Sequence, residues 1–83
     1  MPQMKEAGEI AVKGQAIYDR ALKHVLEPVH NGEFVALDVD TEAYVLAPTA
    51  GEALHLAQEK SPGKVFFLAR VGYRAAHFHR GLH

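Results

Sequence analysis

The chain of 83 residues contains no cysteine and no tryptophan, and Ser61 is its single serine. Without cysteine there is neither a disulfide framework nor a thiolate nucleophile, and secreted domains of this size usually need such cross-links. Ser61 lies in a Ser-Pro-Gly segment that is typical of a helix end, so a serine triad is not available either. We therefore expect a cytoplasmic protein that is not an enzyme.

Long apolar runs and nucleotide-binding loops are also missing. No run approaches the roughly 18 residues that a membrane span requires, and residues 1–9 lack the basic and then apolar order of a signal peptide. Gly51 and Gly63 stand alone rather than in a glycine-rich phosphate loop. We expect no membrane anchor, no export and no nucleotide cofactor.

The acidic and basic residues occupy different parts of the chain. Residues 1–63 carry ten acids and five bases, which sum to −5, whereas residues 64–83 carry four bases and no acid, which sum to +4. Hydrophobic residues make up 48% and charged residues 23%, which are ordinary values for a globular chain. The length fits a single domain over residues 1–83, with an acidic body and a basic end.

Hydrophobic periodicity predicts the first four elements. Apolar residues at three- and four-residue steps, Val25 among them, predict an amphipathic helix over 6–27. Asp19 and Lys23 stand four apart as a helical ion pair, and a turn follows the helix. Residues 33–39 and 43–47 are rich in β-formers and predict two antiparallel strands. Thr49 and Glu52 match a capping box that starts a helix over 49–60.

The last third of the chain completes the predicted sheet. Residues 64–71 are too apolar for an edge strand, so we expect a central strand, followed by a basic, histidine-rich extension over 72–83. A right-handed crossover places this strand parallel to the first and beside it, in the spatial order second, first, third. The prediction is an α+β domain of order α-β-β-α-β, with a three-stranded mixed sheet packed against the helices.

Polar clusters offer few candidates for chemistry. Asp38 and Asp40 resemble the start of a calcium loop, but Ala43 replaces its glycine, so we expect solvent-facing turn residues. Glu52, His55 and Glu59 have helical metal-site spacing without a second such motif, and we interpret them as a solvated stripe. No dedicated metal site is expected. A small enzyme or metal-binding protein that uses histidines such as His77, His79 and His83 remains an alternative.

The basic end is the candidate binding region. Arginines interleaved with aromatic rings can contact phosphates and stack on bases, yet a sequence pI near 6.6 argues against a dedicated nucleic-acid binder. A nucleic-acid-binding protein is therefore the second alternative. The candidate binding residues are Arg70, Tyr73, Arg74, His77, Phe78, His79 and Arg80.

Two phrases of the sequence are specific in combination. The first is Glu27-Pro28-x-His30-Asn31-Gly32-x-Phe34-Val35-Ala36-Leu37-Asp38-Val39, and the second is Ala69-Arg70-Val71-Gly72-Tyr73. Together, from Gly14 to Tyr73, they resemble a group of small uncharacterised bacterial and archaeal proteins that share E-P-x-H-x-G-x-[FY]-V-A-[IL] and R-[VI]-G-Y. The resemblance implies a non-catalytic, antitoxin-like companion, or a partner of a neighbouring small protease-like or toxin-like gene product.

Four residues of these phrases have structural roles without reference to function. Pro28 ends the helix, Gly32 permits a tight entry to the sheet, His30 holds the loop by a hydrogen bond, and Gly72 lets the chain bend. The function that we expect is a protein-interaction module, acting on a protein partner or as a homo-oligomer. The strand edge at Ala43–Ala47 and the apolar side of the first helix are the surfaces that we expect to be used.

Overall fold

The computed structural model describes residues 7–73, so Arg74, His77, Phe78, His79 and Arg80 of the predicted binding region, and His83, lie outside the described residues. The described elements, in chain order, are α1 (Ala7–Ile17), the π-helix η1 (Tyr18–Leu22), α2 (Lys23–Leu26), β1 (Phe34–Leu37), β2 (Tyr44–Ala47), α3 (Ala50–Lys60) and β3 (Phe67–Arg70). None of the helices between residues 7 and 73 has the length and apolar character that crossing a bilayer requires.

The predicted first helix is interrupted by a π-helical turn. The backbone N–H of Lys23 donates to the carbonyl of Tyr18, five residues earlier, so η1 accommodates one more residue than an α-turn. The inward face shifts by one position in consequence: Leu26 is 1% exposed, whereas Val25, which we expected in the core, is 61% exposed. Asp19, which we expected to pair with Lys23, accepts a hydrogen bond from Gln15 at 2.9 Å.

The sheet has the expected strand order but is antiparallel throughout. Its order is β2-β1-β3, and β1 pairs antiparallel with both neighbours. The expectation of a mixed sheet with a parallel, central last strand is therefore wrong. Helix α3 returns the chain along the sheet after β2, so β3 runs in the direction of β2, and β1 lies between them in the opposite direction. Within residues 7–73 the central strand is β1, and β3 is an edge strand.

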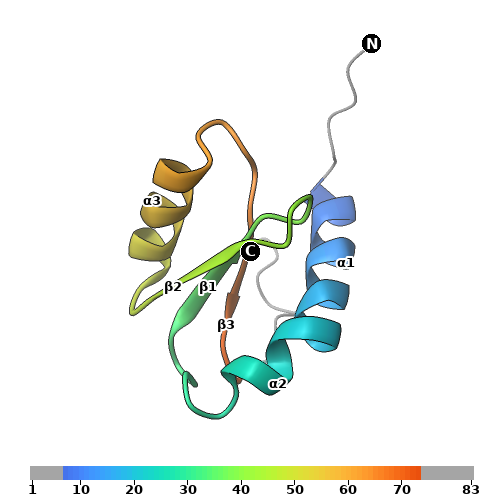
Figure 1. Cartoon of the computed structure of the whole chain (residues 1–83), viewed down its shortest axis with the longest axis vertical. Helices are drawn as coiled ribbons and strands as arrows, with labels where there is room; N and C mark the ends of the chain where they lie inside the picture. Colours follow the sequence, from blue (N-terminus) through green and yellow to red (C-terminus); the bar gives the residue numbers. More distant parts are fainter. Residues whose placement is uncertain (1–6, 74–83) are drawn as a thin grey trace, which may run out of the picture.

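Helices cover both faces of the sheet (Figure 1). On one side α1 and η1 pack over a core of large side chains that includes Ile17, Leu22, Val35, Leu37 and Phe67. On the other side α3 packs through alanines, since Ala53 and Ala57 meet Ala36 and Ala47 of the sheet. Each buried alanine removes less apolar area from water than the large side chains of the first core do, and larger residues such as Phe34, Leu54 and Leu68 are only partly buried on this side.

Helix α3 begins as the sequence predicts. The backbone N–H of Glu52 donates to the Thr49 hydroxyl at 3.1 Å, and that hydroxyl lies 3.3 Å from the Glu52 carboxylate. The cap fixes where the chain leaves β2 for α3. At the other end of α3, Ser61 lies outside helical geometry, and the chain passes through Gly63, whose φ is +80°, toward β3.

Candidate binding surface

A tight turn follows β3 and brings the chain back to Arg70, the last residue of the strand. The backbone N–H of Tyr73 donates to the Arg70 carbonyl at 3.1 Å, and Gly72, at the third position of the turn, has a φ of +86°. Glycine is the residue that adopts this conformation without steric cost. A Cβ at Gly72 would also lie 2.6 Å from the side chain of Asn31. The bend expected at Gly72 is thus observed.

Two aromatic rings lie against the side chain of one arginine beside this turn. The guanidinium carbon of Arg70 lies 4.3 Å from the centre of the Tyr73 ring and 5.4 Å from that of Phe34. Its Nε donates to the carbonyl of Gly32 at 3.2 Å. Arg70 is exposed and Tyr73 is 56% exposed. We call Gly32, Phe34, Arg70 and Tyr73 the Arg70 rim.

The loop before β1 is hydrogen-bonded to the residue that follows β3, and these bonds hold the Arg70 rim in place. Gly32 has a φ of +94°, and its N–H donates to the carbonyl of Val71 at 2.8 Å, while Val71 donates to the carbonyl of Glu33 at 2.8 Å. Two residues therefore face one across the ladder, which is a β-bulge. His30 Nδ1 lies 3.0 Å from the Glu33 carboxylate, so the hydrogen bond expected to hold this loop is present. The peptide bond before Pro28 is cis.

A buried tyrosine joins the π-helix to the same region. The Tyr18 hydroxyl donates to the Glu27 carboxylate at 2.7 Å, and Tyr18 is 6% exposed. Burial, followed by the hydrogen bond to Glu27, raises the pKa of Tyr18 to about 12, although a backbone hydrogen bond from Gly72 acts in the opposite direction. The phenol stays protonated at neutral pH. It ties η1, the end of the helix and the turn after β3 together.

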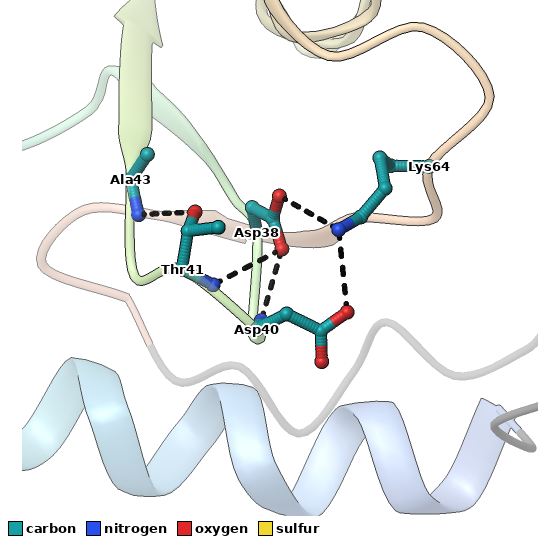
Figure 2. A network of polar contacts seen from close by, with 5 residues as sticks. All are labelled: Asp38, Asp40, Thr41, Ala43 and Lys64. Atoms are coloured by element: carbon teal, nitrogen blue, oxygen red, sulfur yellow. Dashed lines mark hydrogen bonds and ion pairs between the residues drawn. The ribbon is translucent and has the colours of Figure 1, made fainter.

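The polar network at the other end of the sheet corrects an expectation about Asp38 (Figure 2). Asp38 forms a turn as expected, but it is 3% exposed rather than solvent-facing. One carboxylate oxygen accepts from the backbone N–H of Asp40 at 2.9 Å, and the other lies 3.3 Å from Lys64 Nζ. Lys64 Nζ is also 3.3 Å from the Asp40 carboxylate. The network fastens the β1–β2 hairpin to the segment that leads into β3.

This network is fixed in its charged form. Desolvation by burial acts to raise the pKa of Asp38, but hydrogen bonds from the Asp40 backbone and from Lys64 outweigh it and hold the pKa below the ordinary carboxyl value. Hydrogen bonds to Asp38 and Asp40 raise the pKa of Lys64. A general acid or base works best with a pKa near the operating pH. Neither group is therefore suited to proton transfer at neutral pH.

Other candidates for chemistry in the described part of the chain are weak. Among residues 7–73, no group of three His, Asp or Glu side chains is placed to hold a metal ion. His55 lies 3.2 Å from Glu59, and both side chains are well exposed, which fits the solvated stripe expected on α3. A hollow beside the hairpin, lined by Asp38, Tyr44 and Phe66 among others, has a volume of about 20 Å³, the room of a single water molecule.

The structure brings the two phrases of the sequence together. Residues 27–39 and 69–73 form the neighbouring strands β1 and β3 and the loop and turn at their common end. Of the predicted binding residues, Arg70 and Tyr73 meet there. Phe34, Tyr18 and Glu27 take part without having been predicted. Phe34 could have been found from its place in the strand, whereas the Tyr18 contact depends on η1, for which the sequence carries no clear signal.

Comparison of the chain with protein-family models, with curated proteins and with solved structures gives no match.

Proposed function

We propose that the protein is a non-enzymatic interaction module of the cytoplasm, which binds a protein partner through the Arg70 rim, as an antitoxin-like or companion protein would. The single observation that carries this proposal is the placement of Arg70. Its guanidinium is exposed, is contacted by two aromatic rings and is fixed by one hydrogen bond to Gly32. Arginine and tyrosine in such an arrangement are typical of the residues that dominate binding energy at protein interfaces.

The geometry of the side chain supports binding rather than internal stability. Only Nε of Arg70 has a hydrogen-bond acceptor among residues 7–73, so the two terminal nitrogens have no acceptor in the described part of the chain. Stacking on Phe34 and Tyr73 reduces the rotamer freedom of the long side chain before a partner arrives. Less conformational entropy is then lost on binding.

The test is affinity purification from the native host, with mass spectrometry of the proteins that co-elute, followed by reconstitution from purified components. Wild type is compared with Arg70→Glu and with Tyr73→Ala. We expect a defined partner to bind wild type and to bind either variant at least about tenfold more weakly, because hot-spot residues contribute about 2 kcal/mol or more.

Lys13→Glu is the matched control, because Lys13 is an exposed cation on α1 and undergoes the same change of charge. It should bind the partner as wild type does. Equal binding by all four proteins, or an equal loss in Arg70→Glu and Lys13→Glu, would remove the Arg70 rim from the proposal.

A nucleic-acid-binding function is the second candidate, and the contact between Arg70 and Tyr73 is the observation that favours it. A cation beside an exposed ring can contact phosphate and stack on a base. Retention of the protein on a single-stranded oligonucleotide should then fall steeply as salt rises. Retention that ignores salt, or that survives Arg70→Glu, would count against this candidate.

A further inference from the structure

The hydrogen-bonding polarity of β3 follows from two backbone hydrogen bonds of Val71. Both the N–H and the carbonyl of Val71 bond to the segment that leads into β1. Because successive residues of an antiparallel strand direct these groups to opposite sides, Ala69 also faces β1, and Leu68 and Arg70 direct theirs to the outer edge. The Arg70 carbonyl is used by the turn to Tyr73. The N–H and carbonyl of Leu68 and the N–H of Arg70 are therefore directed away from β1.

Helix α3 leaves this side of the sheet partly open. It packs against β1 and β2, whereas α1 packs against β3 from the opposite face. Phe66 and Leu68 lie on the α3 face and are only half-buried, and Val65 is 62% exposed. Phe66, Leu68 and Arg70 alternate on one face of the chain, so a partly exposed apolar strip formed by Phe66 and Leu68 leads to the Arg70 rim.

The charges along β3 argue against pairing with a second copy. Lys64 precedes the strand and Arg70 ends it, and residues 60–83 contain no acid. Lys64 is already engaged by Asp38 and Asp40, so Arg70 is the charge that a partner would meet at this edge. A second copy of β3 would bring no carboxylate to Arg70 and would add a second arginine there. An extended segment that carries a carboxylate would instead be attracted.

The surroundings of Arg70 favour a single carboxylate over a polyanion. Glu27 and Glu33 lie in the loop that forms the rim, and each is already engaged, with Tyr18 and His30 respectively. Their negative charges disfavour a phosphate-rich ligand more than a singly charged one. The planar fork of arginine also matches a carboxylate in bidentate geometry.

We propose that the outer edge of β3 takes up an extended peptide segment of the partner as an additional strand, with a carboxylate of that segment bound by Arg70. This inference rests on the proposed function and names the chemistry of the partner. Backbone bonds to Leu68 and Arg70 would supply affinity, and the apolar strip with the arginine would supply specificity.

The probe is a random heptapeptide library displayed on phage and selected on the full chain, with counter-selection on Arg70→Gln. We expect enriched peptides to combine β-branched residues with one acidic residue at a constant position. The best peptide is then synthesised, together with a version in which glutamine or asparagine replaces the acidic residue. Removing this charge, or Arg70→Gln, should weaken binding about ten- to a hundredfold, as for a charge-assisted hydrogen bond.

Amide hydrogen exchange of the full chain distinguishes strand addition from other modes of binding. On addition of the peptide, the amides of Leu68 and Arg70 should become protected, whereas those of Tyr44 and Leu46 on the β2 edge should not change.

Two proline variants provide a matched pair. Leu68→Pro removes an N–H directed to the outer edge of β3, and Leu46→Pro removes the equivalent group of β2, since the Asp38–Ala43 bond sets the polarity of that strand. Proline is tolerated on edge strands at such positions. Only Leu68→Pro should abolish binding of the peptide. If either variant fails to fold, Arg70→Gln and the exchange pattern decide the question.

Enrichment of peptides without an acidic residue, protection at Tyr44 and Leu46, or failure to enrich any peptide would each overturn the inference. Competition by an oligonucleotide at equal charge concentration, or concentration-dependent dimerisation that protects Leu68 without peptide, would also overturn it. If the Arg70→Glu variant no longer binds the native partner and any of these outcomes is also observed, the proposed function would stand. Only the inference that the partner adds a strand to β3 would then be wrong.

Discussion

At the scale of single residues, Asp38 shows how one carboxylate can fix a hairpin. It is buried, it bonds to the backbone of the turn that follows, and it contacts Lys64 (Figure 2). We expect Asp38→Asn to lower the free energy of unfolding by about 1–3 kcal/mol, since a hydrogen bond with a charged partner contributes about that much. Glu59→Gln, at an exposed site on α3, should change it by less than about 0.5 kcal/mol.

The same residue gives the acid dependence a definite sign. The folded-state pKa of Asp38 is lowered, so the unfolded chain binds the proton more tightly. The contribution of Asp38 is then complete above the ordinary carboxyl pKa and is lost as pH falls through the lower, folded-state pKa. In urea titrations, the difference between wild type and Asp38→Asn should shrink on acidification. A difference that grows as pH falls would contradict this account.

Tyr18 predicts the opposite behaviour in alkali. Its pKa is raised to about 12 by burial and by the hydrogen bond to Glu27. The stabilisation that depends on the protonated phenol is complete below the unfolded pKa of about 10 and is lost as pH rises through about 12, a total of roughly 2–3 kcal/mol. Urea unfolding of wild type and Tyr18→Phe over this range should show converging free energies, since the variant lacks the ionisation. Parallel curves would exclude the assigned pKa.

At the scale of elements, α1 packs closely against β3 because Gly14 has no side chain at the contact. A Cβ on Gly14 would lie 2.1 Å from Cγ of the buried Phe67. Alanine gains about 1 kcal/mol in helix propensity, but the collision should outweigh this gain, for a net loss of about 1–3 kcal/mol. Thermal or urea unfolding of Gly14→Ala measures the result.

The same helix provides the control. Among residues 7–73, no atom beyond its own helical neighbours lies within 4 Å of the Cβ position of Gly8. Gly8→Ala should therefore stabilise the protein by about 0.5–1 kcal/mol. Equal effects of the two substitutions would show that the contact with Phe67 does not limit how closely α1 approaches. In a Phe67→Leu background, the cost of Gly14→Ala should fall.

Element types and strand order could be predicted from the sequence, but winding and direction could not. Periodicity located the helices and strands, and Thr49 marked the start of α3. The turn η1 has no sequence signal, because the apolar pattern around it fits both an α-helix and a helix with a π-turn. Only the burial of Leu26 and the exposure of Val25 in the structure distinguish the two. The crossover rule predicts the wrong direction for β3 when it is applied to β1, because α3 connects β2, and not β1, to β3.

The candidate site was predicted only in part for a related reason. Arg70 and Tyr73 could be singled out as a cation beside an aromatic residue. Their contact with Phe34, however, requires the β1–β3 register, and their contact geometry requires the turn at Gly72. The sequence predicts a solvent-facing Asp38, because a carboxylate is rarely buried unless it is paired and its partner Lys64 stands 26 positions further along the chain.

At the scale of the whole molecule, the two faces of the sheet are held unequally. Large side chains form the core beneath α1 and η1, and alanines form most of the core beneath α3. We expect native-state hydrogen exchange to be slowest at Val35 and Leu37 of the central strand, and faster along α3 by about tenfold or more, since the fully buried side chains beneath α3 are smaller. Uniform exchange across β1 and α3 would show that both faces open together.

The π-turn affects how this sequence should be aligned with homologues. A homologous chain with one residue fewer between positions 18 and 22 could form an unbroken α-helix. Such a helix could bury the residue that corresponds to Leu26 without the extra residue that the π-turn accommodates here. Alignments should therefore allow a single gap within Tyr18–Leu22. The length of that short stretch, more than its composition, would record whether an insertion occurred in this lineage.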